Sequence, residues 1–353
     1  MPALAVADAL RDSGAEVSFI GTRERAEARL VPEAGYEIDF VFARGLDRRN
    51  PIRAAAAAAR PAAAVPAAAR ILRRRAADAL LGGGGYVAGP AGLAALGLRL
   101  PLVLTEADSH LGLANRLLAR RARRVCLAFP IPGLEAPRYL VTGRPVPRRV
   151  LEADRGAARQ RFGIPPEARC LLVFGGSLGA LTINEAALAA FVGGTGGSEP
   201  AMPDSEREFW VLHVAGRRDY PQARSRIEAA QPDRYALLEY EPDLGDALAA
   251  SDLVLARAGG SVFEIAAAGR AAILAPYPHA TARHQHSNAA WMAEAGAAVV
   301  VEDSELTAER TATAVQALLA DETGLERMAA ASRSLARPDA ATRIAGEVLS
   351  ACA

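Results

Sequence analysis

The chain has 353 residues, a formal net charge of +1 and a pI of about 7.8. This length exceeds one ordinary hydrophobic core and suits two domains of roughly 150 to 180 residues each, while the near-neutral charge argues against nucleic acid as a partner. The three cysteines, Cys126, Cys170 and Cys352, are far apart and form no Cys-x-x-Cys pair, which argues against a disulfide framework and a thiolate metal site.

Apolar periodicity in the first half predicts a helix over residues 1–13, closed by Gly14, and then a strand over 16–20. Short apolar runs alternate with helical segments after it, as in a doubly wound α/β sheet. The further strands expected in this half span 38–42, 79–81, 100–105 and 125–129. Since the first strand follows a helix directly, the strand that normally precedes such a helix is missing from the pattern.

The pattern restarts after Pro145 and Pro147 and predicts a second Rossmann-like domain. Its expected strands span 170–174, 210–215, 235–239, 253–256, 272–275 and 298–301. We therefore expect an N-terminal domain over 1–148, a C-terminal domain over 149–337, and a final helical segment over 338–353 that packs back on the N-terminal domain.

Two glycine loops each follow an expected strand and precede a helix, one over 82–90 and one over 175–180. Glycine permits a sharp turn and close approach of a ligand, and the helix N-terminus offers free N–H groups to an anion such as a diphosphate. A tight turn that serves only packing is the alternative for either loop alone. The similar string over 193–197 follows a helix and predicts a flexible surface loop.

A third glycine turn, Gly259-Gly260, follows the strand that ends at Ala256, and Ser261 begins a helix that places Glu264 one turn in. A carboxylate at this position can accept hydrogen bonds from both hydroxyls of a ribose. The alternative is that Glu264 only complements the helix dipole.

In order and spacing these stretches resemble the MurG family, the UDP-N-acetylglucosamine transferases that complete lipid II on the inner face of the bacterial membrane. The likeness extends over nearly the whole chain. Its motifs lie at 2–6, 19–22, 27–32, 84–90, 112–116, 175–180, 257–269, 278–279, 285, 288 and 294–296. The resemblance implies an α/β GT-B fold of two Rossmann-like, doubly wound domains facing a cleft, with UDP-N-acetylglucosamine on the C-terminal domain and undecaprenyl-linked lipid I on the N-terminal one.

The resemblance also implies which residues bind. Donor residues implied by matching position are Gly176, Ser177, Gly179, Gly259, Gly260, Ser261, Glu264, Gln285, Glu241 through its backbone, Arg148 and Asp108. The acceptor diphosphate is expected at Gly84, Gly85 and Tyr86. Asp108 replaces an amide of the family, and the family's arginine is displaced by one position, so that either Arg148 or Arg144 takes the phosphate contact.

The family opens with a strand and a glycine loop that carries the histidine proposed as catalytic base, and its following proline matches Pro2. We expect about 8 to 20 further residues upstream of Met1, because a bare sheet edge and a missing phosphate loop are unfavourable; the upstream codons test this. Within the chain the alternative base is His110. A metal site at His279, His284 and His286 is not expected, since no carboxylate accompanies them in sequence, and no cofactor is expected.

A lipid-linked acceptor requires contact with the membrane, so we expect a peripheral protein on the cytoplasmic face of the bacterial cell membrane, bound to its anionic surface. Arginines gather in the N-terminal half as required, although a solvated helical face explains any one cluster equally well. They are Arg48, Arg49, Arg53, Arg60, Arg70, Arg73, Arg74, Arg75, Arg116, Arg120, Arg121, Arg123 and Arg124.

Three alternative functions fit the same sequence. A related transferase would keep the donor motifs and use another acceptor. A UDP-sugar 2-epimerase would share the two-domain fold and need no acceptor. A UDP-sugar-binding relic without activity would explain the missing first loop.

Overall fold

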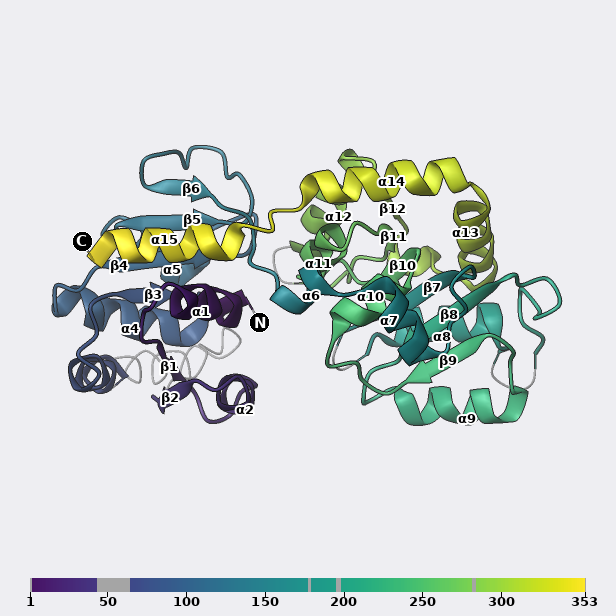
Figure 1. The fold of residues 1–353 in the computed structure, drawn as a ribbon, viewed down its shortest axis with the longest axis horizontal. Coiled ribbons are helices and arrows are strands. Elements are labelled where there is room, and N and C mark those ends of the chain that lie inside the picture. The colour runs from purple at the N-terminus through teal and green to yellow at the C-terminus, as the bar shows by residue number, and fades with distance from the viewer. Residues whose placement is uncertain (1, 43–63, 177–178, 195–197, 281–283, 353) are drawn as a thin grey trace. The chain divides into compact units, whose positions relative to one another are not determined.

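A computed structural model describes residues 2–42, 64–176, 179–194, 198–280 and 284–352 (Figure 1). The chain forms two compact units, one comprising residues 1–147 together with 337–353 and the other residues 148–336. Both units are built from parallel strands connected by helices, which is the architecture predicted from the alternating apolar runs.

The N-terminal unit contains two parallel sheets. The first pairs β1 (Ser18–Gly21) with β2 (Glu37–Phe40), and the second has the order β3 (Leu80–Gly82), β4 (Leu102–Glu106), β5 (Arg124–Leu127) and β6 (Tyr139–Val141). In a doubly wound sheet the first strand lies between the second and the fourth. Here β1 and β3 correspond to the second and the fourth strands of that order, so the first strand would lie between them. Among the described residues no strand pairs with both. The three-residue β6 was not predicted, because it is too short to show an alternating pattern.

Helices cover both faces of the four-stranded sheet. On one face α1 (Pro2–Asp12) and α15 (Ala340–Cys352) pack side by side and bury Val6, Val103 and Ile344 in a common core (Figure 1). The other helices of this unit are α2 (Glu27–Glu33), α4 (Gly85–Gly97), α5 (Leu113–Leu118) and a helix over 64–74. The C-terminal segment therefore belongs to the first unit, where its apolar stripe completes the core.

The C-terminal unit has one six-stranded sheet in which every neighbouring pair is parallel. The strand order is β12 (Ala298–Val300), β11 (Ala271–Leu274), β10 (Leu253–Ala256), β7 (Arg169–Phe174), β8 (Phe209–Val214) and β9 (Tyr235–Leu238). Counted within the unit this is the Rossmann order 3-2-1-4-5-6 read from the other end, and the order reverses between β7 and β10.

This sheet is buried on both faces. Leu171 and Val173 of β7 face α8 (Leu181–Phe191) and α13 (Ala308–Ala320), and the intervening Leu172 is equally inaccessible on the opposite face. The remaining helices are α6 (Arg148–Glu152), α7 (Arg155–Phe162), α9 (Tyr220–Ala230), α10 (Leu244–Ala250), α11 (Val262–Ala267), α12 (His284–Glu294), the 3₁₀ helix η2 (Asp303–Glu305) and α14 (Glu322–Leu335).

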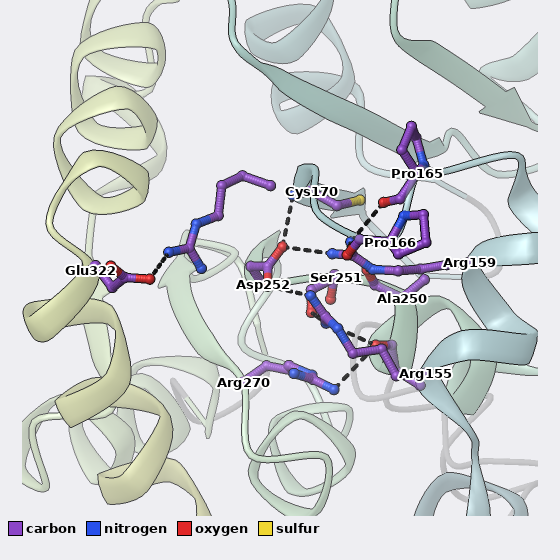
Figure 2. A network of polar contacts seen from close by, with 12 residues as sticks. Arg155, Arg159, Pro165, Pro166, Cys170, Ala250, Ser251, Asp252, Arg270 and Glu322 are labelled. Atoms are coloured by element: carbon purple, nitrogen blue, oxygen red, sulfur yellow. Dashed lines mark hydrogen bonds and ion pairs between the residues drawn. The ribbon is translucent and has the colours of Figure 1, made fainter.

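Three arginines and one aspartate form a polar network that connects α7 and α10 to the amino ends of strands in the six-stranded sheet (Figure 2). Arg155 donates to the carbonyls of Ala249 and Ser251, Arg159 to that of Ala250, and Arg270 to that of Ala249. These are the last carbonyls of α10, where the helix dipole favours cations. Asp252 accepts from Arg155 at 2.6 Å and from Arg159 at 2.9 Å. Burial and the charge of Arg155 lower the pKa of Arg270 to about 10.

Replacing Asp252 with alanine should therefore lower the free energy of unfolding by about 3 kcal/mol, because Arg159, only 3% exposed, would lose its carboxylate partner. Urea unfolding followed by circular dichroism measures the change. Glu228→Ala is the control, since that carboxylate also pairs with an arginine but is 61% exposed. Equal losses for the two variants would contradict the prediction.

Candidate functional site

The glycine loop after β7 lies beside the point where the strand order reverses, which is where open α/β sheets bind ligands. Gly175 has no room for a side chain, since a Cβ there would lie 2.3 Å from the Ala180 Cβ. Gly176 and Gly179 have φ values of 101° and 90°, a region that side chains rarely adopt. The loop leads into the N-terminus of α8, as predicted, whereas Ser177 lies outside the described residues.

The glycine turn after β10 lies on the other side of the same point. Ser261 is the N-cap residue of α11 and Glu264 lies in its first turn, as the spacing predicted. The turn is held from α12, where Asn288 is 4% exposed and donates through Nδ2 to the carbonyls of Ala258 at 3.0 Å and Gly259 at 3.4 Å. Asn288 belonged to the matched motifs, but its role as a clamp was not predicted because the two segments meet only in the fold.

Arg257 connects this turn to the neighbouring strands. Its guanidinium donates to the Ala275 carbonyl at 3.1 Å, forms an ion pair with Asp303 and lies 5.5 Å from the centre of the Tyr277 ring. Because Arg257 is only 9% exposed, these contacts hold its charge in one place at the carboxyl edge of the sheet.

Gln285 and Glu241 have structural partners. Gln285 accepts through Oε1 from the Tyr277 N–H at 2.9 Å, which fixes the loop after β11. The Glu241 side chain is 2% exposed and accepts from Arg161 at 2.8 and 3.0 Å and from the Asp243 N–H at 2.7 Å. The carboxylate of Glu241 is therefore used within the protein, and only its backbone remains for a ligand.

Two other donor matches lie in different surroundings. Arg148 begins α6, is 60% exposed and lies 3.8 Å from Glu152. Asp108 is half-buried in the loop after β4. The Asp108 N–H donates to Glu106 at 3.2 Å.

Glu106 organises that loop, a role that the sequence did not reveal. It is 7% exposed and accepts from the Ala107 and Gly112 N–H groups and from Asn115 Nδ2, at 2.8 to 3.0 Å. A buried carboxylate with this many donors fixes the backbone around it. The loop carries His110, which is exposed.

The glycine loop after β3 leads into α4. Gly84 and Gly85 have φ values of 80° and 74°, and α4 begins at Gly85. Tyr86 is 52% exposed, and the Arg25 guanidinium lies 5.0 Å from the centre of its ring. The expected acceptor loop therefore joins a helix N-terminus, an exposed aromatic ring and a cation.

The histidines after β11 form no metal centre that the structure describes. Within the described ranges no group of three or more histidine, cysteine or acidic side chains is placed to hold a metal ion. His286 instead lies 3.5 Å from Glu302. No helix in the described part of the chain has the length and apolarity needed to cross a bilayer.

Comparison with known proteins identifies the chain's relatives. Residues 1–127 match the glycosyltransferase family 28 N-terminal domain, and residues 170–344 match the glycosyltransferase family 28 C-terminal domain. The UDP-N-acetylglucosamine–N-acetylmuramyl-(pentapeptide) pyrophosphoryl-undecaprenol N-acetylglucosamine transferase of Moorella thermoacetica is 39% identical, over 99% of this chain and 94% of the relative.

Solved structures support the same family assignment. The crystal structure of Acinetobacter baumannii MurG is 28% identical, with a TM-score of 0.74 over 99% of this chain and 95% of that one. The UDP-GlcNAc 2-epimerase from Neisseria meningitidis, bound to UDP-GlcNAc, has a TM-score of 0.66 over 98% and 95% but is 13% identical, so it shows a shared fold alone. The predicted GT-B fold is confirmed, and the chain belongs to the MurG family of UDP-N-acetylglucosamine-dependent glycosyltransferases.

Proposed function

We propose that the C-terminal unit binds UDP-N-acetylglucosamine at the carboxyl ends of β7 and β10. The observation that carries this proposal is the pair of glycine turns on the two sides of the point where the strand order reverses. The diphosphate contacts the loop with Gly176, Ser177 and Gly179 and the turn of Gly259, Gly260 and Ser261. Glu264 accepts from the ribose hydroxyls, Gln285 contacts the sugar and the Glu241 backbone contacts the base.

The acceptor that we propose is undecaprenyl-linked lipid I, on the ground that the Moorella relative is named for this substrate. The 4-hydroxyl oxygen of its muramic acid attacks the anomeric carbon from the face opposite UDP. A new C–O bond forms, the bond between the anomeric carbon and the phosphate oxygen breaks, and UDP leaves with the electron pair. The hydroxyl proton passes to a base, for which His110 is the candidate among the described residues. The acceptor diphosphate would contact Gly84, Gly85 and Tyr86.

UDP release from UDP-N-acetylglucosamine tests the reaction. We expect release that depends on added lipid I. Release of free N-acetylmannosamine without lipid I would favour an epimerase, release with a different acceptor alone would favour a related transferase, and UDP binding without release would favour a relic without activity.

We further propose that α4 and α5 bring the N-terminal unit to an anionic membrane on its cytoplasmic face. Three leucines of these helices are 46% to 69% exposed, namely Leu93, Leu113 and Leu117. Arg116, Arg120 and Arg121 are exposed on α5 and just beyond its end. Arg74 and Arg75 are a weaker part of the expected basic surface, because they pair with Asp39 and Glu37. Arg48, Arg49, Arg53 and Arg60 lie outside the described residues.

The double variant Leu113→Ser, Leu117→Ser should bind vesicles of anionic lipid at least tenfold more weakly, since two apolar side chains would no longer enter the bilayer. Sedimentation with vesicles at low and high salt measures binding. Leu349→Ser, on α15, is the control because that leucine is 37% exposed. Failure of the unmodified chain to sediment at low salt would overturn the membrane proposal.

A further inference from the structure

A chain of buried polar side chains runs beneath the glycine loop after β7. His213 of β8 is fully buried, and its Nδ1 lies 2.7 Å from the Tyr235 hydroxyl while its Nε2 lies 3.0 Å from Asn184 Oδ1. Burial lowers the pKa of His213 to about 3, so the ring is neutral and donates from one nitrogen only. Because Asn184 Oδ1 can only accept, Nε2 carries the hydrogen and Nδ1 accepts from Tyr235.

This arrangement directs the amide nitrogen of Asn184 toward the loop after β8. Asn184 Nδ2 donates to the Ala215 carbonyl at 2.8 Å and to Asp219 Oδ2 at 2.9 Å. The backbone of Gly179 rests on the same two oxygens, since a Cβ there would lie 2.4 Å from the Ala215 oxygen and 2.6 Å from Asp219 Oδ2. The buried network therefore supports the glycine loop from below.

Asp219 also holds the side chain of Arg218. Its carboxylate accepts from Arg218 Nε at 2.6 Å and Nη2 at 3.1 Å, while the Arg218 side chain stays 60% exposed. The hydrogen bond and charge of Asp219 raise the pKa of Arg218. Asp219 Oδ2 also faces Gly179, so Arg218 and the glycine loop meet at the same carboxylate.

We propose that Arg218 binds the diphosphate of the donor. Asp219 is the positioning residue, which holds the Arg218 side chain beside the glycine loop. The inference rests on the proposed function, because it assigns residues to the same donor site. A diphosphate carries more charge than neutral loop amides can offset, and its charge grows as UDP leaves. Arg218 supplies a fixed cation at this edge of the sheet.

Arg218→Gln and Arg224→Gln form a matched pair of variants. Both arginines are 60% exposed and both place Nε 2.6 Å from a carboxylate, but Arg224 pairs with Glu228 within α9. Calorimetric titration with UDP and with uridine separates a phosphate contact from a general change. We expect Arg218→Gln to bind UDP about tenfold more weakly and uridine unchanged, Arg218→Lys to recover part of the loss, and Arg224→Gln to match the unmodified chain.

Asp219→Asn tests the positioning role, because it removes the charge that holds Arg218 and keeps the shape of the side chain. We expect the KM for the donor to rise about fivefold or more while the KM for the acceptor stays the same. If the unmodified chain binds UDP and Arg218→Gln loses no more affinity than Arg224→Gln, the inference fails and the proposed function stands. If the unmodified chain does not bind UDP, both fail.

Discussion

Replacing Gly179 with alanine should weaken UDP binding by at least about 30-fold while the chain remains folded. The residue has a φ of 90°, which an alanine adopts only with strain, and its Cβ would lie 2.4 Å from the Ala215 oxygen. That oxygen cannot move aside cheaply, because it accepts from Asn184, and the Ala215 N–H donates to the Leu238 carbonyl at 3.0 Å. The glycine loop would have to shift, and with it the N–H groups proposed to bind the diphosphate.

The appropriate control for this substitution is Gly163→Ala. Gly163 ends α7 with a φ of 68°, and nothing lies within 4 Å of a Cβ built there, so this variant carries the backbone strain without the clash. Calorimetry with UDP, together with thermal unfolding of both variants, separates loss of the site from loss of stability. Equal UDP affinity in the two variants would contradict the proposed role of the loop.

The sequence was sufficient for features whose physical cause is local. Apolar runs such as Cys170–Phe174 predicted buried parallel strands, and the observed strand β7 differs by one residue at its start. The glycine turns were recognised because a strand, a glycine turn and a helix follow one another in the chain. In both domains these rules predicted which loops reach the carboxyl edge of the sheet.

The sequence was insufficient where a role depends on residues far apart in the chain. Asn184 and His213 are polar residues within apolar segments, and nothing local predicts that they bond to each other or that Asn184 also bonds to Asp219. Glu241 carries a charge beside a proposed base site, yet its carboxylate binds Arg161, which is 80 residues away in sequence. Polar residues of this kind are interpreted correctly only when the partners that bury them are known.

Buried polar partners hold the proposed donor loops more extensively than the proposed acceptor loop. In the C-terminal unit Asn288 donates directly to the turn after β10, and Asn184 holds the Ala215 carbonyl and the Asp219 carboxylate against which Gly179 lies. In the N-terminal unit Glu106 holds the loop after β4 in a comparable way. The loop of Gly84 and Gly85, by contrast, ends in Tyr86, whose ring is exposed. Donor binding is accordingly the step that can be tested most sharply.

Glu264→Ala should lower kcat/KM for UDP-N-acetylglucosamine by about 100-fold, because the carboxylate is proposed to accept from two ribose hydroxyls and each charged hydrogen bond contributes about 1.5 to 3 kcal/mol. A donor that lacks the 2′-hydroxyl gives the decisive comparison. With this donor the substitution should cost clearly less, since one of the two bonds is already absent. Glu309→Ala is the control, since Glu309 also lies in the first turn of a helix, α13, and is exposed. An equal loss with both donors would mean that Glu264 supports the helix through its dipole and does not contact the ribose.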